Sequence, residues 1–136
     1  MTMNNLKPLM AVNGSELAVL VQMVMRCHGL SLVDGSTGGV SPEGVACVNA
    51  MVNDVFGWSA SRYGSLEEQA SDIAVRIASE RPFKTCNDET AVLCAMTVLD
   101  AYGHPVACSQ DAVREAVMAC RNGDADEVVR LLCSYE

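Results

Sequence analysis

The sequence predicts an all-α domain, a single compact bundle of about six helices around one buried central helix. Apolar residues recur at helical spacing in successive segments, which are separated by glycine, proline and capping residues. The alternation typical of a strand is limited to a weak example at 105–108. In the segment 90–99 only Thr90 and Thr97 interrupt the apolar run, and a helix without a polar face belongs in the middle of a bundle.

The first predicted helix spans about 15–28. Ser15 provides an N-cap, apolar residues follow at helical spacing, and Gly29 is expected to end the helix. Residues 34–39 are all small or turn-forming and show no periodicity, so we expect a loop there.

The second predicted helix begins after Ser41, a capping residue that is followed by a proline at the first helical position. It should end at about residue 56 and turn its apolar residues toward the core: Val45, Val48, Val52, Val55 and Phe56. A loop that contains Trp58 is expected between Gly57 and Gly64.

The third predicted helix runs from Ser65 to about Ser79. Ser65 and Glu68 have the spacing of a capping box, in which each side chain accepts a hydrogen bond from a free backbone donor. The apolar stripe of this segment is narrow, which predicts a solvated outer face. Pro82 is expected to end the helix.

The central helix is predicted over 88–101, and two shorter helices follow it. Ser109 provides the cap of the first of these, and the pair Asn122-Gly123 should end it. Asp124 is expected to begin the last helix.

The length of 136 residues suits one domain with its own core. We expect residues 1–14 to form a flexible lead-in and residues 15–136 to form the helical domain. No stretch approaches the roughly 20 consecutive apolar residues that a transmembrane helix needs, so no membrane association is expected. The N-terminal residues also lack the apolar core of a secretory signal.

The cysteines and the charges restrict the cellular setting and the partners. Seven cysteines are scattered singly, without a C-x-x-C pair, which favours a reducing, cytoplasmic environment and argues against a structural zinc site. The formal net charge is −8 and the basic residues form no cluster, so we do not expect binding to nucleic acid. An acidic surface of this kind is either simply solvated or favours a basic partner.

A distinctive loop leads into the central helix, and it reads Arg81-Pro82-Phe83-Lys84-Thr85-Cys86-Asn87-Asp88-Glu89-Thr90-Ala91. It resembles the Fic/Doc motif His-x-Phe-x-Asp-(Gly/Ala)-Asn-Lys-Arg-Thr-Ala, which also runs into a wholly apolar helix. The segments 38–45, 63–79 and 100–103 are similar to the corresponding parts of Doc-type proteins. The resemblance therefore covers residues 15–135 and implies the six-helix Fic/Doc core.

For an intact family member, the resemblance implies transfer of an AMP or phosphate group to a protein hydroxyl. The motif His is then the general base, the acidic residue holds a divalent metal, and Asn, Lys and Arg hold phosphate. Here Arg81 stands at the base position and cannot accept a proton near neutrality. Thr85 stands at the metal position, Cys86 replaces the small residue, and Asp88 and Glu89 replace the two cations.

We therefore expect a catalytically inactive Fic/Doc-like protein that acts by binding a protein, in a toxin–antitoxin, phage or plasmid setting. Its partner would be an antitoxin-like segment or a host protein, and neither a nucleotide cofactor nor a metal ion is expected. The candidate binding site is the altered motif: Arg81, Phe83, Lys84, Thr85, Cys86, Asn87, Asp88, Glu89 and Thr90.

Two enzymatic alternatives stay open. One is a residual or altered transferase of the Fic/Doc type, with metal held by Asp88 or Glu89. The other is an activity based on Cys86, which precedes a helix N-terminus, where thiol pKa values fall and where Arg81 or Lys84 could assist. The simpler interpretation is that Cys86 fills a small position in the turn.

Local structure around the motif can also be predicted. Asn87 is expected to cap the central helix, and Asp88 and Glu89 lie in its first turn, where a carboxylate stabilises a helix by about 0.3–1 kcal/mol. His28 and His104 are expected to have structural or solvent-facing roles.

Overall fold

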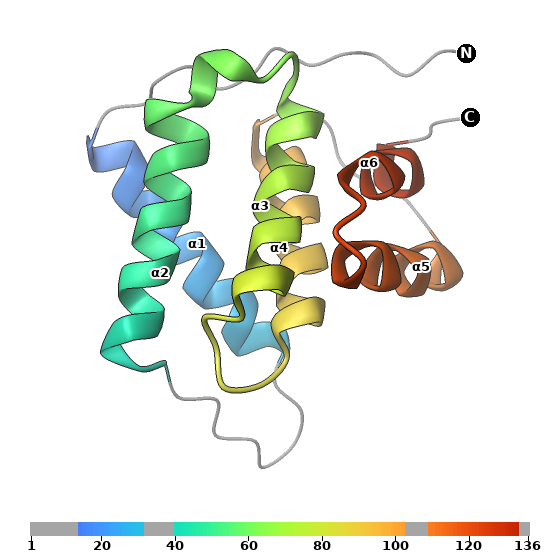
Figure 1. Cartoon of the computed structure of the whole chain (residues 1–136), viewed down its shortest axis with the longest axis horizontal. Coiled ribbons are helices and arrows are strands. Elements are labelled where there is room, and N and C mark those ends of the chain that lie inside the picture. The colour runs from blue at the N-terminus through green and yellow to red at the C-terminus, as the bar shows by residue number, and fades with distance from the viewer. Residues whose placement is uncertain (1–13, 32–39, 103–108, 134–136) are drawn as a thin grey trace.

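The computed structural model describes residues 14–31, 40–102 and 109–133 (Figure 1). These residues form six α-helices and no β-strand, which confirms the predicted all-α bundle. The strand suggested at 105–108 lies outside the described residues, as does almost all of the predicted lead-in at 1–14. Within the described parts of the chain, every helix is too short or too polar to cross a bilayer.

Helix α1 spans Gly14–Ser31 and helix α2 spans Pro42–Asn53. The Ser41 side chain accepts a hydrogen bond from the backbone N–H of Gly44 at 3.0 Å, so the predicted N-cap is confirmed. The prediction that Gly29 ends α1 is wrong. A helix interior tolerates glycine at a cost of about 0.5–1 kcal/mol, and here the helix continues past it to Ser31.

The core-facing side of α2 differs from the predicted one at its N-terminal end. Val45 is 39% exposed, because the residue that faces the core there is the buried Gly44. The other four predicted residues are buried: Val48, Val52, Val55 and Phe56. The sequence predicts a helix to about residue 56 and then a loop, whereas α2 ends at Asn53 and continues into a π-helical turn, η1 (Asp54–Trp58). Within the predicted loop lies a short 3-10 turn, η2 (Ala60–Arg62).

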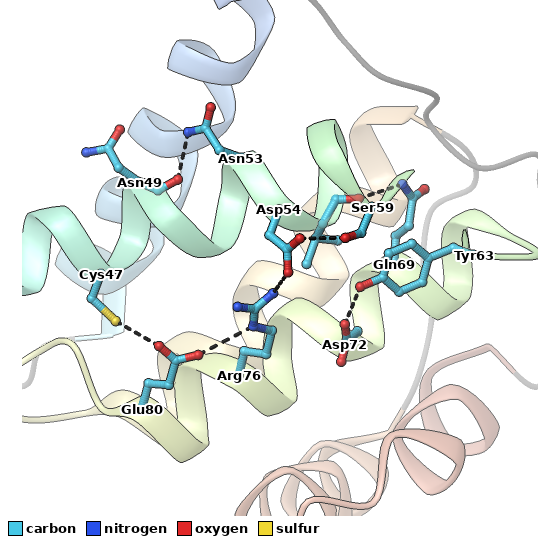
Figure 2. Close-up of polar contacts among 11 residues, drawn as sticks. Cys47, Asn49, Asn53, Asp54, Ser59, Tyr63, Gln69, Asp72, Arg76 and Glu80 are labelled. Atoms are coloured by element: carbon cyan, nitrogen blue, oxygen red, sulfur yellow. Dashed lines mark hydrogen bonds and ion pairs between the residues drawn. The ribbon is translucent and has the colours of Figure 1, made fainter. Parts of the chain in front are cut away.

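Polar contacts join α2 and η1 to the third helix (Figure 2). Arg76 donates hydrogen bonds to Asp54 at 2.6 Å and to Glu80 at 3.4 Å, and the Cys47 thiol donates to Glu80 at 3.3 Å. The hydrogen bonds from Ser59 and from Arg76 lower the pKa of Asp54. This network holds α2 and η1 against α3, up to the last residue before the motif loop.

Helices α3 (Leu66–Glu80) and α4 (Asn87–Tyr102) lie side by side at the centre of the bundle (Figure 1). Helix α4 contacts α1, α3 and α5, as predicted for the central helix. The prediction of a solvated outer face on α3 is wrong, because α5 and α6 cover that face. Even polar side chains of α3 are buried, and one of them, Gln69, donates a hydrogen bond to the Val55 carbonyl of η1 at 3.2 Å. The buried polar residues are Glu67, Gln69 and Ser71.

Capping at the start of α3 follows the predicted pattern with one change. The Ser65 side chain accepts a hydrogen bond from the backbone N–H of Glu68 at 3.2 Å. The Glu68 carboxylate accepts from the backbone N–H of Gly64 at 3.2 Å, whereas a capping box requires the N–H of Ser65. Both acceptors still stabilise the chain entry into the helix.

Helices α5 (Gln110–Arg121) and α6 (Ala125–Cys133) pack together on one side of α3 (Figure 1). The Ser109 side chain accepts a hydrogen bond from a backbone N–H of the first turn of α5 at 3.1 Å, which confirms this cap. Gly123 takes a positive φ of 73° where α5 ends, and Asp124 caps α6 at 3.1 Å. The predicted turn between these helices is therefore also confirmed.

Candidate functional site

The motif loop connects the end of α3 to the start of α4, and a left-handed residue stands at each of its ends. Arg81 has a φ of 50° where α3 ends, and Cys86 has a φ of 60° immediately before α4. Side chains other than glycine disfavour this conformation by about 1–2 kcal/mol. The two residues reverse the chain direction, so that the first turn of α4 faces the last turn of α3.

Asn87 closes the loop rather than capping the helix, so the predicted cap is wrong. Its side-chain oxygen accepts a hydrogen bond from the backbone N–H of Phe83 at 2.9 Å, and its side-chain nitrogen donates to the Phe83 carbonyl at 2.8 Å. Asn87 and Phe83 are buried, and buried backbone groups need partners. The side chain therefore satisfies the loop backbone, while its own backbone already belongs to α4.

Asp88 connects three helices through two arginines. Its Oδ1 accepts a hydrogen bond from Arg81 Nη1 at 3.3 Å, and its Oδ2 accepts from Arg121 Nε at 3.0 Å and Nη2 at 2.8 Å. The Asp88 side chain is only 5% exposed, whereas both arginines are 53% exposed. The carboxylate thus lies buried at the N-terminus of α4, between the C-terminal ends of α3 and α5.

The remaining motif residues divide into buried and exposed groups. Thr90 is buried, and its Oγ1 atom has no hydrogen-bond partner in the described structure. Lys84, Thr85 and Glu89 are exposed. A hollow of about 320 Å³ lies beside the loop, and it is lined by Ser41, Arg81, Pro82, Phe83 and Lys84.

The second helix of the bundle presses directly against this loop. A Cβ atom added at Gly44 would lie 2.2 Å from the carbonyl oxygen of Pro82, so only glycine permits the observed approach. Because Gly44 is buried in the first turn of α2, the loop is enclosed between α2 and the start of α4.

His28 also supports the loop, and its contact with the motif has no direct signal in the sequence. Its ring stacks on Phe83 with a centroid distance of 3.9 Å and an interplanar angle of 7°. Its Nε2 lies 3.2 Å from the Thr85 carbonyl oxygen and donates to it in the corresponding tautomer. Burial lowers the pKa of His28, and the hydrogen bond to Thr85 opposes that effect. The histidine therefore has the structural position that its place on an apolar helix face predicts.

These contacts determine what the motif can do chemically. Arg81 is a permanent cation, and the Asp88 carboxylate already accepts hydrogen bonds from two guanidinium groups. His28 is buried and directed at a backbone carbonyl. Across the described residues, no three His, Cys, Asp or Glu side chains gather in a way that could hold a metal ion. The motif is thus a closed structural unit in which its main polar groups bind one another.

A second concave region lies between α1 and α4, where the sequence predicts no site. The hollow has a volume of about 570 Å³, and two exposed apolar side chains, Val19 (60%) and Leu30 (70%), stand in its wall. Its lining residues are Val19, Gln22, Met23, Arg26, Cys27, Leu30, Thr97, Ala101 and Tyr102. Six of these lining residues come from α1 and share one helical face. A second apolar stripe on that helix is therefore the sequence signal that could have predicted the hollow.

Comparison of the chain with protein-family models, with curated proteins and with solved structures finds no match.

Proposed function

We propose that this chain is a Fic/Doc-like protein without transfer activity, which acts in the cytoplasm by binding an antitoxin-like segment of another protein. The observation that carries the proposal is the hollow between α1 and α4, where large apolar side chains are exposed beside a pocket of about 570 Å³. Exposed apolar surface of this kind marks interaction sites.

The backbone of the motif loop supports the resemblance. At the position where the family has Gly or Ala, Cys86 takes a left-handed φ of 60°, the conformation that glycine adopts most readily. Phe83 and Asn87, two residues that this chain shares with the family motif, hydrogen-bond each other across the loop. The shared residues are therefore those that build the turn.

The side chains of the motif support a loss of transfer chemistry. A general base at the first motif position must have a pKa near neutrality. Arg81 stands there instead, and its guanidinium donates a hydrogen bond to Asp88. Phosphate would have to bind at the N-terminus of α4, where the buried Asp88 carboxylate already lies. The internal carboxylate takes the place that an anionic substrate would require.

The hollow favours an amphipathic helical segment as the bound partner. Apolar side chains of such a segment would fill the space beside Val19, Met23 and Leu30. Arg26 lines the same hollow and forms no ion pair with another described residue. A carboxylate on the edge of the segment would therefore be recognised by Arg26.

The experiment is an affinity capture of partners from native cells, followed by measurement of Kd for each identified partner. We expect Val19→Glu and Leu30→Glu to raise Kd more than tenfold, because each places a charge in the apolar wall. Ala18→Glu, at an exposed position of α1 outside the hollow lining, is the matched control and should leave Kd unchanged. Equal Kd values for all these variants would refute binding at this surface.

A second pair of measurements separates the hollow from the motif. Lys84→Glu with Glu89→Lys reverses two exposed motif charges and should leave partner binding intact. Isothermal titration calorimetry with ATP and Mg²⁺ should give no saturable binding. Loss of the partner on charge reversal would move the interface to the motif, and saturable ATP binding would restore the transferase alternative.

A further inference from the structure

Two buried thiols meet between α1 and α4. Cys27 on α1 and Cys94 on α4 are 2% and 0% exposed, and each thiol shifts the pKa of the other, as neighbouring groups do. The Cys27 thiol also lies 3.5 Å from the hydroxyl oxygen of Thr97. Thr97 lies three residues after Cys94 on α4, so the fold brings two reduced thiols to the same part of the α1–α4 interface although they are far apart in the sequence.

The two thiols differ in access. Cys27 lines the hollow of about 570 Å³, whereas Cys94 is fully buried and does not line it. A molecule as small as hydrogen peroxide can therefore approach the Cys27 sulfur. Cys94 is positioned to react only with Cys27.

The local electrostatics also favour Cys27 as the first thiol to react. The hydrogen bond with Cys94 lowers the pKa of Cys27 to about 7, assisted by Thr97 and the charge of Arg26 and opposed by burial. The pKa of Cys94 is raised by its hydrogen bond with Cys27 and by burial. Because the thiolate is the nucleophile, Cys27 is the reactive member of the pair.

Two further thiols of the described structure, Cys47 and Cys120, have the opposite environment. Burial and the neighbouring Glu80 raise the pKa of Cys47 to about 11 (Figure 2). Burial raises the pKa of Cys120 to about 12. These two cysteines therefore serve as internal references for a thiol that stays protonated.

We propose that Cys27 and Cys94 form a peroxide-sensitive dithiol, which closes to a disulfide between α1 and α4 when hydrogen peroxide enters the hollow. The Cys27 thiolate attacks one peroxide oxygen and the O–O bond breaks, which gives a sulfenic acid and hydroxide. The hydroxide takes up the proton that the thiol released and becomes water. The Cys94 sulfur then attacks the Cys27 sulfur, the S–O bond breaks, and a second water leaves with the Cys94 proton. Two sulfur atoms are oxidised, and the two oxygen atoms of the peroxide are reduced.

The test is a titration of the reduced full-length chain with hydrogen peroxide, followed by non-reducing peptide mapping in a mass spectrometer. We expect one cross-linked peptide pair containing Cys27 and Cys94, with a mass lower by two hydrogen atoms. In Cys94→Ser, the Cys27 sulfenic acid should persist and be trapped by dimedone. In Cys27→Ser, the cross-link should vanish and Cys94 should stay reduced. The reaction rate of the wild-type chain should rise with pH through about 7.

Controls separate this chemistry from general thiol oxidation. Cys120→Ser removes an equally buried thiol and should leave the cross-link unchanged. Cys27→Ala and Cys94→Ala are measured in parallel, so that a serine variant that folds poorly does not decide the outcome. A cross-link from Cys27 to another cysteine, oxidation of Cys94 in the Cys27→Ser chain, or oxidation of Cys47 or Cys120 at the same rate as Cys27 would each overturn the proposal. None of these readouts depends on partner binding.

Discussion

Arg121 donates two hydrogen bonds to a single oxygen of Asp88, from Nε at 3.0 Å and from Nη2 at 2.8 Å. This contact connects the last residue of α5 to the first turn of α4 and places a cation at the C-terminal end of one helix and a carboxylate at the N-terminal end of another. Both placements agree with the helix dipoles. The Asp88 carboxylate is thus part of the structure that holds the helices together.

Removal of the Asp88 carboxylate should destabilise the fold. Hydrogen bonds to charged groups contribute about 1.5–3 kcal/mol, so we expect Asp88→Ala to lower the free energy of unfolding by about 2 kcal/mol in a urea titration. Arg114→Ala is the control, because the Arg114–Asp111 pair is largely exposed and such pairs contribute about 0–1 kcal/mol. If the two variants lost similar amounts of unfolding free energy, the buried position of Asp88 would not strengthen its contribution to stability.

The close approach of α2 to the motif loop should make Gly44 intolerant of substitution. Gly44→Ala places a methyl group 2.2 Å from the Pro82 carbonyl oxygen, and we expect a loss of about 1–3 kcal/mol as the loop is displaced. Gly29→Ala is the matched variant, since its Cβ meets nothing within 4 Å and should stabilise α1 by about 0.5–1 kcal/mol. Thermal or urea unfolding of both variants measures the sign and the size of each stability change.

The left-handed backbone at Cys86 predicts opposite tolerance for two small substitutions. Cys86→Gly relieves the positive φ but makes the unfolded chain more flexible, so stability should stay within about 1 kcal/mol of the wild type. Cys86→Val should cost about 1–3 kcal/mol, because a β-branched residue is strained at this φ. If urea unfolding instead found valine better tolerated than glycine, the left-handed conformation would be excluded.

His28 should make stability depend on pH. Burial lowers its pKa in the folded chain from the usual 6.5, so the unfolded chain binds the proton more tightly. This contribution to stability is complete above pH 6.5 and is lost as the pH falls below 6.5, until folded His28 is itself protonated.

The measurement for His28 is urea unfolding at a series of pH values. His28→Phe keeps an aromatic ring against Phe83 but cannot titrate, so its stability should vary less with pH in this window. The carboxylates of Asp54 and Glu127, whose pKa values are lowered by their hydrogen-bond partners, act at more acidic pH. An unchanged pH slope in His28→Phe would assign the effect to other groups.

Much of the fold could be predicted because its signals are local. The caps at Ser41, Ser109 and Asp124 act on backbone groups within one helical turn, so the residue type and its position are sufficient. The apolar run 91–99 predicted a buried central helix for a similar reason, since no side of it can face water favourably. These features did not depend on which other segment lay beside them.

The candidate site was less predictable because its decisive contacts join distant parts of the chain. The sequence placed Thr85 and Asp88 in one short segment, but their partners His28 and Arg121 come from α1 and α5.

By itself, the sequence determined the helices, their order, the central apolar segment and the charges of the motif loop. The tertiary structure decided that His28 stacks on Phe83, that Asp88 lies between two arginines, and that an apolar hollow remains between α1 and α4. The physical reason is how far apart along the chain the interacting residues lie. Capping and periodicity act within a few residues, whereas burial, ion pairing and thiol contact depend on which helix faces pack together.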